Sequence, residues 1–216
     1  VLAQAWQGDF SLARNLGVAR ASGDWVLVLD CDEVLSRADH ARLQRLLQAP
    51  GPMAYWKMDE CQGTTIHDSA GNNLSGTLTI GTGAGTGHQD SAGTCSAVDA
   101  TTVWYNGRTG KRNNSINLDG TDDMVSITDG TSSPLDVNTM TLAAWIYIGA
   151  TASDRVIMHK VNAYGLNLAY SAGGVGGAAG KIGFHRFAGA SWSSVNSTSN
   201  QPLNSWVFVV GTYDGT

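Results

Sequence analysis

Apolar and polar side chains alternate along residues 140–148, and this period of two predicts a strand with one face buried. The apolar set consists of Met140, Leu142, Ala144, Ile146 and Ile148. Similar short runs occur at residues 116–118, 124–127, 156–158, 164–170, 182–187 and 206–210. From the alternation we expect a core that includes Leu118, Val125, Leu142, Ala144, Ile146, Val207 and Val209.

Turn dipeptides lie between these runs. Asn106-Gly107, Asp119-Gly120, Asp129-Gly130 and Asp214-Gly215 are all sequences that favour tight connections between antiparallel strands. Many short strands joined by glycine-rich turns are typical of an antiparallel sandwich. Residues 53–216 are therefore predicted to form an antiparallel β-sandwich, which makes the chain mainly β.

The first fifty residues follow another pattern. Apolar positions at helical spacing predict a helix over 10–21 and a second over 38–47, and the continuous apolar run at 25–29 predicts a buried strand between them. This part holds nine Leu and no Thr, whereas residues 51–216 hold eight Leu and nineteen Thr. We therefore expect a small α/β segment at 1–49, a linker at 50–52 and the β-domain at 53–216.

Charge and composition exclude several classes of partner. Only 14% of the residues are charged and the formal net charge is −5, so neither nucleic acid nor an anionic membrane surface is favoured. The longest clean apolar run, Val26–Leu29, is too short to insert into a membrane. The chain begins with Val1 and shows no leader pattern, which we interpret as processing or a start within a longer gene.

Residues 5–47 resemble the family-two inverting glycosyltransferases. The resemblance is carried by Trp6–Asn15, which contains Asp-Phe-Ser and Ala-Arg-Asn, and by Ala21–Glu33, which ends in Asp-Cys-Asp-Glu. It implies a nucleotide-sugar site with Asp30 near the ribose and base, Asp32 as a ligand of Mg²⁺ or Mn²⁺, and Arg14 and Asn15 beside the donor. Such enzymes act on cytoplasmic nucleotide sugars. The resemblance includes neither the upstream nucleotide-binding strands nor the acceptor half, so we expect no transferase activity from this chain.

Residues 53–216 resemble the laminin-G-like, concanavalin A-like jelly rolls of secreted bacterial proteins. The matching blocks are Ala54–Glu60, Gly63–Asn72, Gly76–Leu78, Asn117–Ile127, Met140–Tyr147 and Trp206–Gly215. The family continues beyond the last block with a closing strand, so the resemblance implies a domain incomplete at its C-terminus. It also implies an extracellular or cell-surface module that binds a glycan or glycoprotein, with adhesion to protein as the alternative.

Sugar binding needs exposed aromatic rings near polar side chains. Candidates in Asn-, Ser- or Gly-rich sequence are Trp104, Tyr105, Tyr164 and Trp192. Three other tryptophans, Trp56, Trp145 and Trp206, lie in strand patterns and are expected in the core. The scattered histidines follow no zinc-site spacing.

Calcium is the cofactor that the jelly-roll resemblance suggests. Glu60, Asp68 and Asn72 supply oxygen ligands within one loop, and we place any Ca²⁺ there rather than at Asp30 and Asp32. The alternative is that Asp68 caps an Asx-turn and Asn72 takes a left-handed conformation. A second acidic group, Asp119, Asp122 and Asp123, is interpreted as shaping a hairpin turn. Cys61 and Cys95 can pair, and Cys31 is expected to stay reduced.

Overall fold

The structure is a computed structural model, and the chain divides into two compact units, Val1–Gly51 and Pro52–Thr216. The predicted helix–strand–helix segment at 1–49 lies outside the residues that the structure describes, as do its candidate residues Arg14, Asn15, Asp30 and Asp32. The described residues are 51–215 with the exception of 83–87, 97–98, 100, 105–109, 131, 150–154, 169–179 and 189–190.

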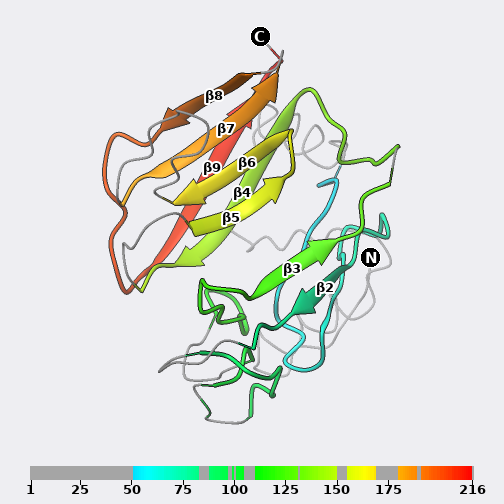
Figure 1. The fold of residues 1–216 in the computed structure, drawn as a ribbon, viewed down its shortest axis with the longest axis vertical. Helices are drawn as coiled ribbons and strands as arrows, with labels where there is room; N and C mark the ends of the chain where they lie inside the picture. The colour runs from blue at the N-terminus through cyan, green and yellow to red at the C-terminus, as the bar shows by residue number, and fades with distance from the viewer. Residues whose placement is uncertain are drawn as a thin grey trace, which may run out of the picture. The chain divides into compact units, whose positions relative to one another are not determined.

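The described part contains strands and no helix, as the sequence predicted for a mainly β domain (Figure 1). Its elements are β1 (Thr65–Ile66), β2 (Gly76–Thr79), β3 (Met124–Ile127), β4 (Met140–Tyr147), β5 (Arg155–Lys160), β6 (Tyr164–Leu168), β7 (Ile182–Ala188), β8 (Ser191–Asn196) and β9 (Trp206–Tyr213). They form sheets of order β1-β2-β3, β4-β9 and β5-β6-β7-β8, and each strand pairing is antiparallel. The described residues therefore include no helix that could cross a membrane.

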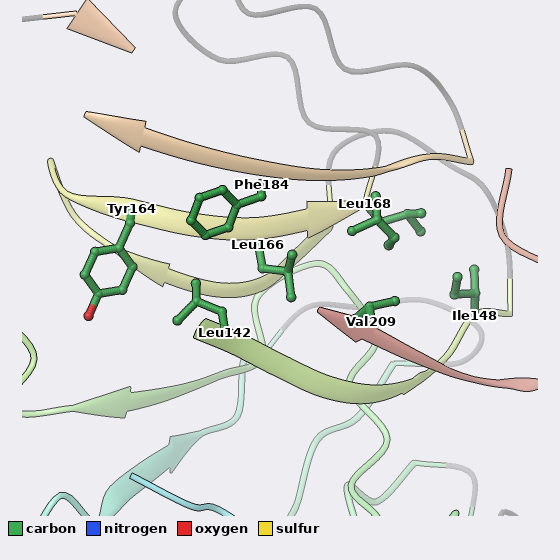
Figure 2. Close-up of a cluster of buried hydrophobic side chains, with 8 residues drawn as sticks. Leu142, Ile148, Tyr164, Leu166, Leu168, Phe184 and Val209 are labelled. Atoms are coloured by element: carbon green, nitrogen blue, oxygen red, sulfur yellow. The ribbon is translucent and has the colours of Figure 1, made fainter. Parts of the chain in front are cut away.

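The main core lies between the β4–β9 pair and the β5–β8 sheet. Figure 2 shows Leu142 and Val209 from the pair facing Leu166 and Phe184 from the larger sheet. The alternation of β4 sends Leu142, with Ala144 and Ile146, toward this core, as the hydrophobic pattern predicted. The two sheets thus form the layers of an antiparallel sandwich.

A second core lies beside the β1–β3 sheet. Ile66, Leu78 and Val103 are buried there around Trp104, and Val125 and Trp56 pack against them. The disulfide between Cys61 and Cys95 lies at this core, since the Cys95 side chain also packs against it. The pairing that the sequence permitted is therefore formed.

Two core predictions were wrong. Trp145 lies on the outward side of β4 and is 42% exposed, because the alternation that buries Leu142 and Ala144 turns residue 145 the other way. Its ring instead packs on that of Phe208, its partner on β9, with ring centroids 5.1 Å apart. Leu118 is 40% exposed, and residues 116–118 form no strand. Trp206 and Trp56 are half-buried.

Candidate functional site

Two of the aromatic residues predicted to bind sugar are buried. Trp104 is 0% exposed and donates a hydrogen bond from Nε1 to the carbonyl oxygen of Gly63 at 2.8 Å. Tyr164 is 6% exposed, and its hydroxyl donates to the carbonyl oxygen of Leu135 at 2.8 Å. Neither ring can stack on a sugar, so the expectation that they are exposed is wrong. Tyr105 lies outside the described residues.

Trp192 on β8 is the sugar-binding candidate that reaches the surface. Its ring is half-buried. The ring centroid lies 5.0 Å from the centroids of both His185 and Phe187 and 6.4 Å from that of His159. Phe187 is its direct cross-strand neighbour. These contacts fix the indole orientation while leaving part of the ring exposed.

Strand register places the partners of Trp192 on one face of the β5–β8 sheet. His159 on β5 pairs with Gly165 on β6, Gly165 pairs with His185 on β7, and His185 pairs with Ser194 on β8. Paired residues project to the same side of a sheet, so these four positions form one row across it. Trp192 lies two residues before Ser194 and therefore projects to this same face, which we call the Trp192 face.

Gly165 makes room for the imidazole in this row. A Cβ at residue 165 would lie 2.6 Å from Cε1 and Nε2 of His185, so the ring occupies the space that any larger residue would fill. The side-chain amide of Asn167, which is 1% exposed, lies 3.1 Å from Nδ1 of His185. Asn167 and Gly165 therefore hold the His185 ring in one place.

Both histidines of the Trp192 face are predominantly neutral at pH 7. Burial lowers the pKa of His185, and the nearby His159 lowers it further. Burial also lowers the pKa of His159. A neutral imidazole has one nitrogen that donates and one that accepts, which suits hydroxyl groups.

Sequence reasoning missed His159, His185 and Asn167 as parts of a site with Trp192. They come from three different strands, and only the strand register brings them to one face. The run 191–196 was itself not predicted as a strand, because serine and asparagine fill most of its positions. The available signal was spacing: Gly165 and Asn167 on one strand, and Gly183 and His185 on the next, are two positions apart and therefore lie on the same face of their strands.

The loop predicted to hold calcium is organised by hydrogen bonds to Asp68. Its Oδ1 accepts from the backbone N–H groups of Tyr55 at 3.1 Å and Ala70 at 2.9 Å, and its Oδ2 from those of Asn72 at 2.9 Å and Leu74 at 3.2 Å. Burial acts to raise the pKa of Asp68, but these four donors together lower it below its ordinary value. Asp68 therefore anchors the loop, as in the Asx-turn alternative.

The other two predicted calcium ligands lie on either side of this anchor. Oε1 of Glu60 accepts from the backbone N–H of His67 at 2.8 Å, while Nδ2 of Asn72 donates to the carbonyl oxygen of Met53 at 3.0 Å. The left-handed backbone belongs to Asn73, with φ of 60°, and not to Asn72. Calcium at this loop stays a prediction, and Glu60 is the member whose second oxygen, Oε2, accepts no hydrogen bond from the described residues.

The second acidic group shapes a turn before β3, but this is not the predicted hairpin turn, because residues 116–118 form no strand. Asp123 accepts from the backbone N–H groups of Gly81 at 3.1 Å and of Asp119 at 3.2 Å. Oδ1 of Asp119 accepts from the N–H of Thr121 at 2.7 Å. Gly120 takes the left-handed conformation, with φ of 74°, that a non-glycine residue rarely adopts.

Comparison with known proteins confirms both resemblances. Residues 119–216 match the concanavalin A-like lectin/glucanases superfamily, and residues 1–104 match glycosyl transferase family 2. The first match starts later than the expected 53, and the second extends beyond the expected 47. The second part of the chain is thus similar to concanavalin A-like domains and the first part to glycosyl transferases of family 2.

A TPR repeat-containing protein of the cyanobacterium Synechococcus elongatus is 44% identical to this chain over 55 residues. The match covers 26% of this chain and 14% of the relative, so only a small part of the two proteins is shared. No solved structure matches the chain.

Proposed function

We propose that the β-domain binds carbohydrate through the Trp192 face. The observation that carries the proposal is the grouping of Trp192 with His159 and His185, whose ring centroids lie 6.4 and 5.0 Å from that of the indole. The apolar C–H face of a sugar ring packs on an indole, and its hydroxyls exchange hydrogen bonds with neutral polar groups. The concanavalin A-like match supports carbohydrate as the class of ligand.

The chemistry of the Trp192 face favours a neutral glycan. The two histidines whose rings lie beside the Trp192 indole, His159 and His185, both have lowered pKa values and are predominantly neutral at pH 7. The neighbouring cations are engaged elsewhere: Lys160 pairs with Asp129 and Asp136, and Arg186 lies over the Tyr213 ring with its Cζ 4.3 Å from the centroid. A sulfated or sialylated glycan would find no free cation among these residues.

Glycan-array screening followed by isothermal titration calorimetry of the full chain tests the proposal. Trp192→Ala is expected to weaken binding of a neutral oligosaccharide by about tenfold or more, because it removes the stacking surface. Trp145→Ala is the matched control, since it removes an exposed tryptophan from β4, outside the Trp192 face. Equal affinity of Trp192→Ala and the wild type would contradict the proposal, as would preference for an acidic glycan.

Placement of the β-domain outside the cell is part of this proposal. The Cys61–Cys95 disulfide supports it, because such bonds persist in oxidising compartments. Oxidised cysteines in protein isolated from the cell surface or medium under thiol-blocking conditions are expected. Free thiols at both positions in freshly isolated protein would argue against it.

A second candidate function is binding of a nucleotide sugar by the first part of the chain. The match of residues 1–104 to glycosyl transferase family 2 favours it, and Asp30 and Asp32 are the proposed contacts to ribose and to Mg²⁺ or Mn²⁺. Assays with sugar nucleotides and Mn²⁺ are expected to show no transfer, since orienting donor and acceptor together needs more than a metal site. Turnover that disappears in Asp32→Ala would contradict this expectation.

A further inference from the structure

His88 lies between two carboxylates at the turn before β3. Its Nδ1 is 2.9 Å from Oδ2 of Asp119, and its Nε2 is 3.9 Å from Oδ1 of Asp122. One nitrogen and two oxygens from the three side chains all lie within 4.8 Å of one another. The side chains of His88 and Asp119 are 14% and 5% exposed, whereas that of Asp122 is 40% exposed, so the group opens to the solvent on the Asp122 side.

Among the described residues, the oxygens that face His88 have no partner other than the His88 ring. Asp119 has a side chain that is only 5% exposed, and its Oδ2, like Oδ1 of Asp122, is buried and accepts no hydrogen bond from the described residues. This contrasts with Oδ1 of Asp119, which accepts from Thr121, and with both oxygens of Asp123. Buried carboxylate oxygens are normally satisfied by a donor or a cation. Within the described part of the chain, Nδ1 of His88 lies 2.9 Å from one of them, and it also lies 3.4 Å from the carbonyl oxygen of Gln89.

The backbone holds these carboxylates in place. Asp123 ties the turn to Gly81 through the 3.1 Å hydrogen bond from the Gly81 N–H. A Cβ at residue 81 would lie 1.8 Å from Cγ of Asp122, so the carboxyl group of Asp122 occupies the space beside the bare Gly81 backbone. Arg155 donates a hydrogen bond to the carbonyl oxygen of Gly120 in the same turn. These contacts fix the backbone of the turn, and the turn holds Asp119 and Asp122 beside His88.

We propose that His88, Asp119 and Asp122 bind a divalent transition-metal ion of the Zn²⁺ class. One imidazole nitrogen and two carboxylate oxygens are ligands that Zn²⁺ and Co²⁺ accept, whereas Ca²⁺ and Mg²⁺ prefer sites made entirely of oxygen. The ion would satisfy both buried oxygens and would link the segment containing His88 to the turn before β3. Its role is structural, and it differs from the calcium prediction at Glu60 and from sugar binding at Trp192.

Titration of the metal-stripped full chain with Zn²⁺ and Co²⁺ tests the proposal, by calorimetry and by the absorption spectrum of bound Co²⁺. The wild type is expected to bind a single ion at this site and to melt at a higher temperature with Zn²⁺. His88→Gln and Asp119→Asn are each expected to weaken binding by about tenfold or more. His67→Gln is the matched control, because His67 also faces a carboxylate, with its Nδ1 3.6 Å from Glu60, but is 69% exposed.

A measurement on the wild type keeps the test independent of how the variants fold. X-ray absorption of the Zn²⁺-loaded chain is expected to show one imidazole nitrogen and a shell of oxygens. A sulfur ligand would assign the ion to Cys31 and overturn the proposal, and so would absence of Zn²⁺ binding. Binding that is unchanged in His88→Gln, with circular dichroism matching the wild type, would reduce the cluster to an ion pair.

Discussion

The aromatic ring of Phe184 on β7 lies against the backbone of Gly211 on β9. A Cβ at residue 211 would be 2.4 Å from Cδ2 and 2.8 Å from Cγ of Phe184. Gly211 is also the cross-strand partner of Leu142, so the missing side chain lets the two sheets approach at the centre of the main core. This contact joins the β4–β9 pair to the sheet that carries the Trp192 face.

Gly211→Ala is expected to lower the free energy of unfolding by about 1–3 kcal/mol, because the added methyl group must displace the Phe184 ring. Urea unfolding followed by tryptophan fluorescence measures the change. Gly130→Ala is the control, since nothing lies within 4 Å of a Cβ at that position. A Gly211→Ala protein as stable as the Gly130→Ala protein would show that the two layers can separate without cost.

Asp68→Ala is expected to lower the free energy of unfolding by about 1–3 kcal/mol, because four backbone N–H groups lose their shared acceptor. The pKa of Asp68 in the folded protein is below its ordinary value of 3.8. Its stabilising contribution is therefore complete above pH 3.8 and is lost as the pH falls through the folded-state pKa. Unfolding measured from about pH 5 to about pH 2 should show a smaller loss in Asp68→Asn than in the wild type. Parallel curves for the two proteins would contradict the anchoring role.

The two histidines of the Trp192 face, of which His185 is buried, predict a separate pH dependence at mild acidity. The pKa values of His185 and His159 in the folded protein lie below the ordinary 6.5, so the unfolded chain takes up protons first as the pH falls. Stability is thus fully present above that value and decreases as the pH drops through it. His185→Gln should flatten the decrease measured between about pH 7.5 and about pH 5.5, and the exposed His67→Gln should not. A steeper decrease in His185→Gln would show that His185 is stabilised by protonation instead.

Removing the disulfide is expected to lower the free energy of unfolding by about 3–4 kcal/mol, the entropic effect of a loop closed over a sequence separation of 34. The double variant Cys61→Ser, Cys95→Ser provides the measurement, and Cys31→Ser, which leaves the bond intact, is its control. Equal stability of the double variant and the wild type would show that the second core holds this loop without the bond.

Calcium binding at the Glu60–Asn72 loop is expected to raise the melting temperature of the wild type. Glu60→Gln should abolish the shift while leaving the hydrogen bonds to Asp68 intact, because Oε2 of Glu60 is the oxygen available to an ion. Asp32→Asn is the control for the other acidic site. A shift that survives in Glu60→Gln and vanishes in Asp32→Asn would assign the ion to the first segment.

Local patterns in the sequence determined the β-architecture and much of the main core. Because side chains on a strand alternate with a period of two, the run Met140–Tyr147 already separates Leu142 and Ala144 from Thr141 and Trp145. When both faces of a strand carry apolar side chains, the pattern does not show which face a neighbouring layer covers. Trp145 was therefore placed in the core although it is 42% exposed.

Only the tertiary structure decided which tryptophan is available and which polar groups meet. Trp104 and Trp192 lie in similar sequence surroundings, but Trp104 is enclosed through a hydrogen bond to Gly63, 41 residues earlier, whereas Trp192 lies on an outward sheet face. His88 contacts Asp119, which lies 31 positions later in the sequence, and no spacing rule predicts that contact. These contacts depend on strand register and on where the chain folds back on itself. Both are set by the packing of distant segments and not by any short stretch of residues.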